Sequence, residues 1–263
     1  MPPHPLEDRR VFSEFHKIVG YIINDPHEAS SAVMKVLLDN RDQVAVPEDF
    51  YKLDYDEQEK IVKDNLRTVF QGKRILFLAG RYGFHAKALS KLGAKVMLTT
   101  GYDMELSPVD KILNSFNLLG KGRLKIIPKK LEQALDSRAV KNFNPDYVFF
   151  SNICNVRRFR KHPLYHLNKL NSDRSFINMH WNTMLDKILA ASPNGSVYFD
   201  PAGKRGTPVW TPNELANRFS GRISFWKPQP APEEDQFFPD SLMGTIVAIH
   251  PHGRLPPYAR IIE

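Results

Sequence analysis

The feature that most constrains the fold is a repeated alternation of short apolar runs with helical stretches, which begins near residue 73. The runs are rich in Val, Ile, Leu and Phe, as buried strands are. They lie at residues 74–79, 95–100, 124–127, 146–150 and 196–199. The helical stretches that follow them lie at residues 84–92, 108–119, 131–135, 175–191 and 213–219. Strands joined through helices pair in parallel and are covered on both faces. We therefore predict an α/β fold with a doubly wound, mostly parallel sheet.

The end of the chain departs from this alternation. Two further apolar runs, at residues 222–226 and 243–249, are joined by a Pro-rich and acidic stretch at residues 228–240 that has no helical period. Two strands joined by a loop, without a helix, favour an antiparallel pair. We place this pair at the edge of the sheet.

The first 70 residues are predicted to be helical. Apolar residues recur every three or four positions over residues 6–23, and further helices are predicted at residues 29–38 and 55–70. Asp54 precedes the third helix, where its side chain can cap the first turn. We therefore divide the chain into a helical N-terminal extension, residues 1–70, and an α/β domain, residues 71–263.

Charge separates the same two parts. Residues 1–70 hold 14 Asp and Glu against 9 Lys and Arg, whereas residues 71–263 hold 15 against 28, a net charge of +13. A domain this basic attracts polyanions such as RNA, although it can also attract its own acidic N-terminal segment.

The single cysteine, Cys154, gives no sign of a disulfide-stabilised, secreted protein. No apolar run reaches the length that spans a bilayer, and the first residues lack the apolar stretch of a signal peptide. We expect a cytoplasmic protein with no membrane contact and no metal site, and the sequence does not indicate an oligomeric state.

Residues 74–96 combine a strand, a turn that contains Gly80 and Gly83, a helix and the entry to a second strand. This segment resembles the class I S-adenosylmethionine-dependent methyltransferases, whose seven-stranded sheet ends in an antiparallel strand. The two glycines would let the backbone approach a ligand at the helix N-terminus. The resemblance implies S-adenosylmethionine as cofactor and a set of cofactor-binding residues. These are Ala79, Gly80, Gly83, Phe84, Thr100, Asp103 and Ser151.

The segment also departs from the family. Methyltransferases of this class usually carry acidic residues where this chain has Phe77, Thr100 and Lys129. Asp103 is the nearest carboxylate to the second of these positions. The departures imply that the cofactor is bound atypically or is not bound. The spacing of Gly80, Gly83 and Asp103 also partly fits dinucleotide binding, so an NAD(P)-binding oxidoreductase remains an alternative.

Polar residues follow the fourth and fifth predicted strands, where ligands bind in open α/β sheets. Asn152, Asp200 and Lys204 are candidate catalytic residues that could align a nucleophile and arrange its loss of a proton. Asn155, in the same loop as Ser151 and Asn152, is a candidate for binding the substrate. Each of these residues could equally be an ordinary loop or capping residue.

Residues 157–169 contain five Lys and Arg with two aromatic residues among them. Cations that neutralise phosphates, beside aromatic rings that stack on bases, are typical of segments that bind single-stranded nucleic acid. We name as substrate-binding candidates Arg157, Arg158, Phe159 and Arg160. A solvated basic loop is the alternative.

The leading hypothesis is a methyltransferase with an atypical cofactor site that acts on RNA or another anionic substrate. A catalytically silent relative that binds nucleic acid or protein is the alternative from another functional class.

Overall fold

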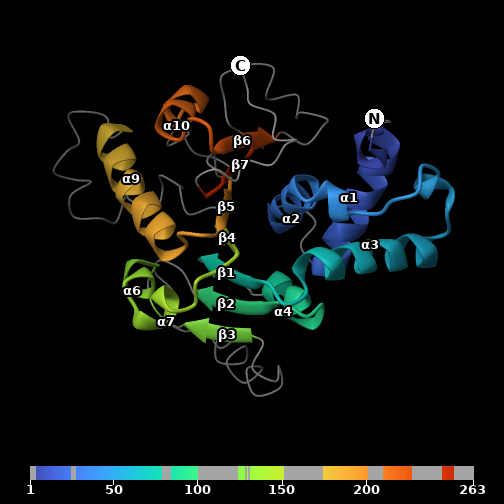
Figure 1. Ribbon diagram of the computed structural model, residues 1–263, viewed down its shortest axis with the longest axis horizontal. Helices are drawn as coiled ribbons and strands as arrows, with labels where there is room; N and C mark the ends of the chain where they lie inside the picture. The colour runs from blue at the N-terminus through green and yellow to red at the C-terminus, as the bar shows by residue number, and fades with distance from the viewer. Residues whose placement is uncertain are drawn as a thin grey trace.

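In the part of the chain that the structure describes, seven strands form one sheet, in the order β3-β2-β1-β4-β5-β7-β6 (Figure 1). The computed structural model describes residues 4–24, 28–78, 84–99, 124–127, 129, 131–150, 174–200, 210–226 and 245–251, with the side chains of residues 28, 29, 84 and 174–180 excepted. The strands are β1 (Arg74–Leu78), β2 (Lys95–Thr99), β3 (Leu124–Ile127), β4 (Tyr147–Phe150), β5 (Ser196–Phe199), β6 (Ile223–Trp226) and β7 (Ile246–Ile249). All seven coincide with predicted strands: β3 and β5 match the predicted ranges, and the others differ by one to three residues at one end.

The strand directions confirm the predicted fold class. β1, β2, β3, β4 and β5 pair in parallel, whereas β7 runs antiparallel to both of its neighbours, β5 and β6. The closing strand pair therefore lies at the sheet edge, as predicted. The fold is α/β, with a mostly parallel sheet and a C-terminal antiparallel pair.

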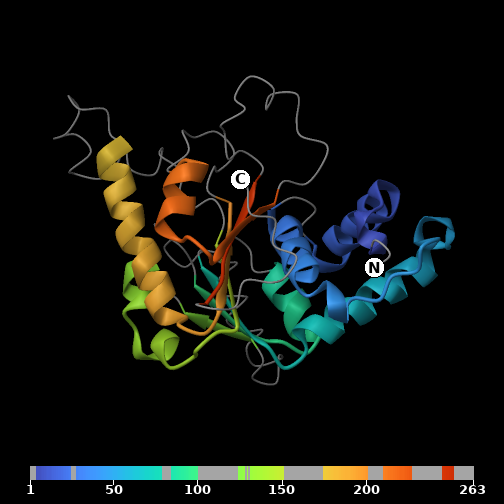
Figure 2. The same ribbon diagram turned by 45° about the horizontal axis from the view of Figure 1, so that its top comes forward.

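Helices cover both faces of the sheet (Figure 2). The α-helices of the described residues are α1 (Arg9–Ile23), α2 (Glu28–Asp39), α3 (Tyr55–Phe70), α4 (Phe84–Lys91), α6 (Leu131–Leu135), α7 (Arg138–Lys141), α9 (Arg174–Ala191) and α10 (Pro212–Arg218). Short 3-10 turns lie at Pro5–Glu7, Arg41–Gln43 and Phe50–Lys52. The predicted helix at residues 108–119 lies outside the described residues, and α7 was not predicted.

One core lies between the sheet and the first four helices. Side chains of α1, α2, α3 and α4 pack with Phe77, Phe149 and Tyr198, which face this side from β1, β4 and β5. The opposite core holds Leu76, Phe150 and their neighbours against α6, α7, α9 and α10. The predicted N-terminal helices therefore form one covering layer of the sheet.

Local signals explain where these helices begin. The Asp8 carboxylate accepts the backbone N–H groups of Arg10 and Val11, so α1 begins at Arg9 and not at Leu6. Asp54 caps α3 by accepting the N–H of Glu57, as predicted. Among the described residues, no helix is long and apolar enough to cross a membrane.

Candidate functional site at the carboxyl edge of the sheet

The strand order reverses between β1 and β4. From β1 the chain crosses through α4 to β2 on one side, while β4 lies on the other side of β1. In open α/β sheets, ligands bind beyond the carboxyl ends of the strands at such a point, because the crossover helices leave a crevice there. Leu78, the last residue of β1, is the register partner of Phe150, the last residue of β4. The two predicted ligand-binding loops therefore leave the sheet from neighbouring positions.

The end of β5 lies at the same edge. Phe199, its last residue, is the register partner of Phe150. Asp200, a predicted catalytic residue, follows directly and is half-buried. The structure thus places Asp200 at the carboxyl end of β5, the strand that pairs with β4.

Most of the other predicted site residues lie outside the described part of the chain, so their roles stay predictions. They are Ala79, Gly80, Gly83, Thr100, Asp103, Ser151, Asn152, Asn155, Arg157, Arg158, Phe159, Arg160 and Lys204. Phe84 begins α4, and its side chain is not described. The helix begins where the sequence predicts it, directly after the Gly80–Gly83 segment, which lies outside the described residues.

Phe77 occupies a packed aromatic position. Its ring stacks on Phe149, with centroids 5.0 Å apart, and lies 4.6 Å from the ring of His85 in the first turn of α4. Only 4% of Phe77 is exposed. A carboxylate here would have to be buried among these rings, at a high desolvation cost. The acidic position that the resemblance implies is therefore part of the hydrophobic core.

The other two departures lie at strand ends. Thr99, the last residue of β2, is fully buried, and Thr100 follows it. Lys129 lies just beyond β3 and is exposed. Beyond β3, the chain therefore presents a cation to solvent at a position where the resemblance implied an acidic residue.

A polar cluster between α9 and α10 supports the end of β5. The Trp210 ring packs on Phe199 at a centroid distance of 5.7 Å, and its Nε1–H donates to Asn182 Oδ1 at 2.9 Å. Arg218 also donates to Asn182, and it pairs with Asp186 at 2.6 Å. Because Asp200 follows Phe199, both Asp200 and Trp210 are held at this edge.

The sequence patterns did not predict this cluster. One usable signal was present: Thr211 and Glu214 form a reciprocal capping box at the start of α10, directly after Trp210. Such a box fixes where the helix begins and so fixes the position of the residue before it. The partners on α9 left no comparable signal.

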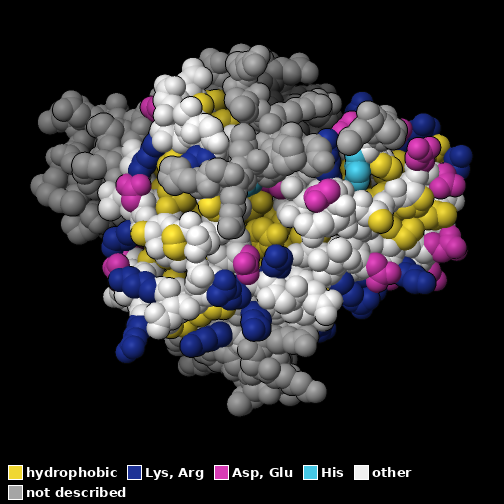
Figure 3. Space-filling view, viewed as in Figure 1, with side chains coloured by type: hydrophobic (Ala, Val, Ile, Leu, Met, Phe, Trp, Pro, Cys, Tyr) yellow, Lys and Arg dark blue, Asp and Glu magenta, His cyan; other side chains and the backbone are white. Residues whose placement is uncertain are grey.

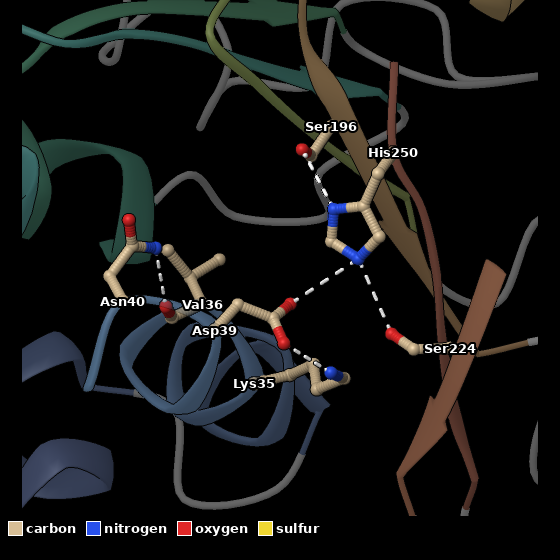
Figure 4. Close-up of polar contacts among 7 residues, drawn as sticks. All are labelled: Lys35, Val36, Asp39, Asn40, Ser196, Ser224 and His250. Carbon is tan, nitrogen blue, oxygen red and sulfur yellow. Dashed lines mark hydrogen bonds and ion pairs between the residues drawn. The ribbon is translucent and has the colours of Figure 1, made fainter. Parts of the chain in front are cut away.

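A second polar cluster lies at the opposite, amino edge of the parallel strands (Figure 4). Lys35 and Asp39 of α2 form a buried ion pair, and His250 lies directly after β7. Because β7 is antiparallel to β5, His250 lies beside Ser196, the first residue of β5. This cluster is therefore separate from the proposed ligand site. Within the described residues, no three His, Cys, Asp or Glu side chains gather as a metal site would require.

No protein-family model matches the chain, and a comparison with curated proteins finds no match. Among solved structures, the chain is similar to WbdD in a complex with the kinase inhibitor LY294002, at 16% identity and a TM-score of 0.43. That match covers 75% of this chain and 41% of WbdD, so this chain spans well under half of that protein.

Two further similarities are at the same level. The complex of SMU.776 with SAH matches at 12% identity and a TM-score of 0.43, over 75% of this chain and 49% of that one. A SAM-dependent methyltransferase from Agrobacterium tumefaciens matches at 10% identity and a TM-score of 0.41, over 72% and 59%. With scores below 0.5, the fold assignment rests on the sheet itself. Seven strands, with β7 antiparallel between β5 and β6, are what the resemblance implied. The fold is class I methyltransferase-like.

Proposed function

We propose that this chain is an S-adenosylmethionine-dependent methyltransferase that acts on RNA or another anionic substrate. The observation that carries the proposal is the register of Leu78 with Phe150 at the point where the strand order reverses. The Gly80–Gly83 turn follows one of these strands and the polar Ser151–Asn152 pair follows the other. Glycines let the backbone approach a ligand, and the N-terminus of α4 offers unpaired N–H groups to it.

The residues at this edge fit the cofactor in part. The Gly-containing turn and α4 suit its close approach, whereas Phe77 is packed in an aromatic stack and supplies no carboxylate. We therefore propose an atypical site in which Asp103 accepts hydrogen bonds from the ribose. When bound, S-adenosylmethionine would supply an electrophilic methyl group.

The chain's own residues would then position the acceptor. Transfer from a sulfonium requires alignment of the nucleophile, exclusion of water and removal of a proton where the acceptor carries one. Asp200 follows the last residue of β5, next to the end of β4, and we propose it as the group that accepts the proton. Asn152 and Lys204 complete the proposed set by orienting the acceptor and by pairing with its negative charge.

An anionic substrate is supported by the charge of residues 71–263 and by the surface. Figure 3 shows Lys and Arg side chains gathered over the lower part of one face, around the region where Figure 1 places α6, α7 and β3. Exposed Lys125 and Lys129 lie in β3 and just beyond its carboxyl end. Such a patch raises the local concentration of polyanions.

The cofactor part is tested by the melting temperature of the protein with S-adenosylhomocysteine, NAD or NADP. At 100 times its dissociation constant a ligand adds about 2.7 kcal/mol to the free energy of unfolding, so S-adenosylhomocysteine should raise the melting temperature clearly. Gly80→Val should abolish this rise, because a branched side chain blocks the approach of the backbone. Gly221→Asn, in a turn before β6, is the matched control that should keep it.

The substrate part is tested by RNA binding at several salt concentrations. Replacing Arg157, Arg158 and Arg160 together by Ala should lower the affinity and reduce the salt slope by roughly 0.7 for each phosphate that is no longer neutralised. Phe159→Ala should lower the affinity by about 1–3 kcal/mol with little change in slope if its ring stacks on a base. Parent-like binding by the triple variant would leave residues 157–169 as a solvated loop.

One observation favours a second candidate function. The buried aromatic packing of Phe77 is also what a catalytically silent relative would show after loss of the acidic position. Such a scaffold would bind RNA, but S-adenosylhomocysteine would not raise its melting temperature and it would not transfer radioactive methyl groups from S-adenosylmethionine to RNA. A methyltransferase would show both the rise in melting temperature and the methyl transfer.

A further inference from the structure

A buried ion pair joins the N-terminal helices to the closing strands of the sheet. Lys35 and Asp39, one turn apart on α2, pair with side chains that are only 5% and 4% exposed. Asp39 Oδ1 accepts from the Lys35 ammonium, whereas Oδ2 has no hydrogen-bond partner among the described residues. Instead, Oδ2 lies 3.7 Å from His250 Nε2 (Figure 4). One carboxylate therefore faces two basic groups.

The surroundings of His250 suit a neutral ring. Its Nδ1 lies 3.1 Å from Ser196 Oγ and its Nε2 lies 3.3 Å from Ser224 Oγ. Since a hydroxyl can donate or accept, the two serines satisfy either neutral tautomer of the ring. Burial, and secondly the Lys35 ammonium, lower the pKa of His250 to about 3.

A protonated His250 would be poorly accommodated. Its positive charge would lie in the core beside Lys35, with the single Asp39 carboxylate between them, and one of the two cations would be left without a full partner. An uncompensated buried charge is costly, whereas separation of the packed elements returns the imidazolium to water. The interface that would open is the one between α2 and the strands β5 and β7.

We propose that His250 is a proton-operated latch, whose protonation releases α2 from the β5–β7–β6 end of the sheet. This conformational switch does not depend on the proposed methyl transfer. It lies at the amino edge of the parallel strands, so it controls how the N-terminal helical layer is held and not the binding of ligands at the other edge.

The other groups that face the latch act differently in acid. Tyr147 of β4 and Tyr198 of β5 have raised pKa values, chiefly through burial, so both are already protonated and do not change charge. Burial also raises the pKa of Asp39, so the folded protein binds a proton on Asp39 more readily than the unfolded chain does. Asp39 therefore stabilises the folded state as pH falls, and His250 works against it.

The test is amide hydrogen exchange of α2 between pH 6 and pH 4, corrected for the intrinsic exchange rate, in the parent and in His250→Gln. Glutamine can still hydrogen-bond to the serines through its amide but cannot take up the proton. Opening binds one proton below the ordinary histidine pKa of about 6.5. The ratio of opening constants, parent over variant, should therefore rise by up to about tenfold for each unit by which the pH falls.

A second variant separates the latch from general acid sensitivity. In Lys35→Met a protonated His250 can pair with Asp39 in place of the ammonium, so the acid-induced rise should be smaller than in the parent, although burial still opposes protonation. Amides of α9, which pack on the opposite face, should not follow α2 in the parent. A parent-to-variant ratio independent of pH would overturn the latch, as would an unchanged rise in Lys35→Met or parallel opening of α2 and α9.

Discussion

Replacement of Asp39 by Asn should cost the protein much of its stability. The change removes the charge partner of Lys35, whose ammonium is then left in the core with a side chain 5% exposed. Removal of one member of a buried pair typically costs about 3–5 kcal/mol, because the remaining charge stays desolvated. That is a large part of the total, since folded proteins are stable by only about 5–15 kcal/mol. We therefore expect a large fall in the midpoint of urea unfolding at pH 7.5, as measured by circular dichroism.

Two controls make this prediction sharp. Glu14→Gln breaks the exposed pair of Glu14 with Lys17 on α1, where the side chains are 41% and 77% exposed, and should cost less than about 1 kcal/mol. The double variant Lys35→Met with Asp39→Leu removes both charges and should recover more than half of the stability that Asp39→Asn removes. If Asp39→Asn proves no more destabilising than Glu14→Gln, the ion pair is not buried as described and the reasoning on α2 fails.

Two further predictions concern packing and ionisation. Gly195→Asn should cost about 1–3 kcal/mol of stability, because a Cβ at Gly195 would lie 2.3 Å from the Pro145 carbonyl oxygen. Gly221→Asn should be tolerated, because asparagine can adopt the φ of +73° at this position and no atom lies within 4 Å of the added Cβ. Equal urea midpoints for the two variants would contradict this prediction. Burial, and secondly Asp146, raise the pKa of Tyr147 to about 12, so the folded state keeps a phenol proton that the unfolded state loses, and stability should fall as pH rises above 10. The test is the difference in tyrosinate absorbance between the parent and Tyr147→Phe as pH is raised. This difference should have its midpoint near pH 12, whereas a midpoint near pH 10 would show that the ring is exposed.

The fold could be predicted from the sequence because each signal is local. Strands buried on both faces are short apolar runs, and the caps at Asp8 and Asp54 determine where their helices begin. The start of α1 was the instructive difference. The apolar period extends back to Leu6, but Asp8 accepts the first free N–H groups, so residues 5–7 form a 3-10 turn.

The polar clusters could not be predicted, because they join residues that are far apart in the chain. His250 and Asp39 are brought together only when α2 packs on β5 and β7. The residues next to His250 in the sequence do not distinguish it from a histidine that is exposed to solvent. Asn182 and Trp210 likewise meet only across the packed helices α9 and α10. Phe77 shows the limit of the resemblance: the sequence marks the missing carboxylate, but only the structure shows the aromatic stack that occupies its place.

The central claim, that the carboxyl edge between β1 and β4 is the cofactor site, is tested most directly by amide hydrogen exchange with and without S-adenosylhomocysteine. We predict slower exchange in the peptides that follow β1 and β4, which contain Gly80 and Asn152, because a ligand bound between the two loops shields both. Peptides from α2, at the amino edge, should be unchanged. No protection at saturating ligand, or protection confined to peptides away from the ends of β1 and β4, would contradict the claim.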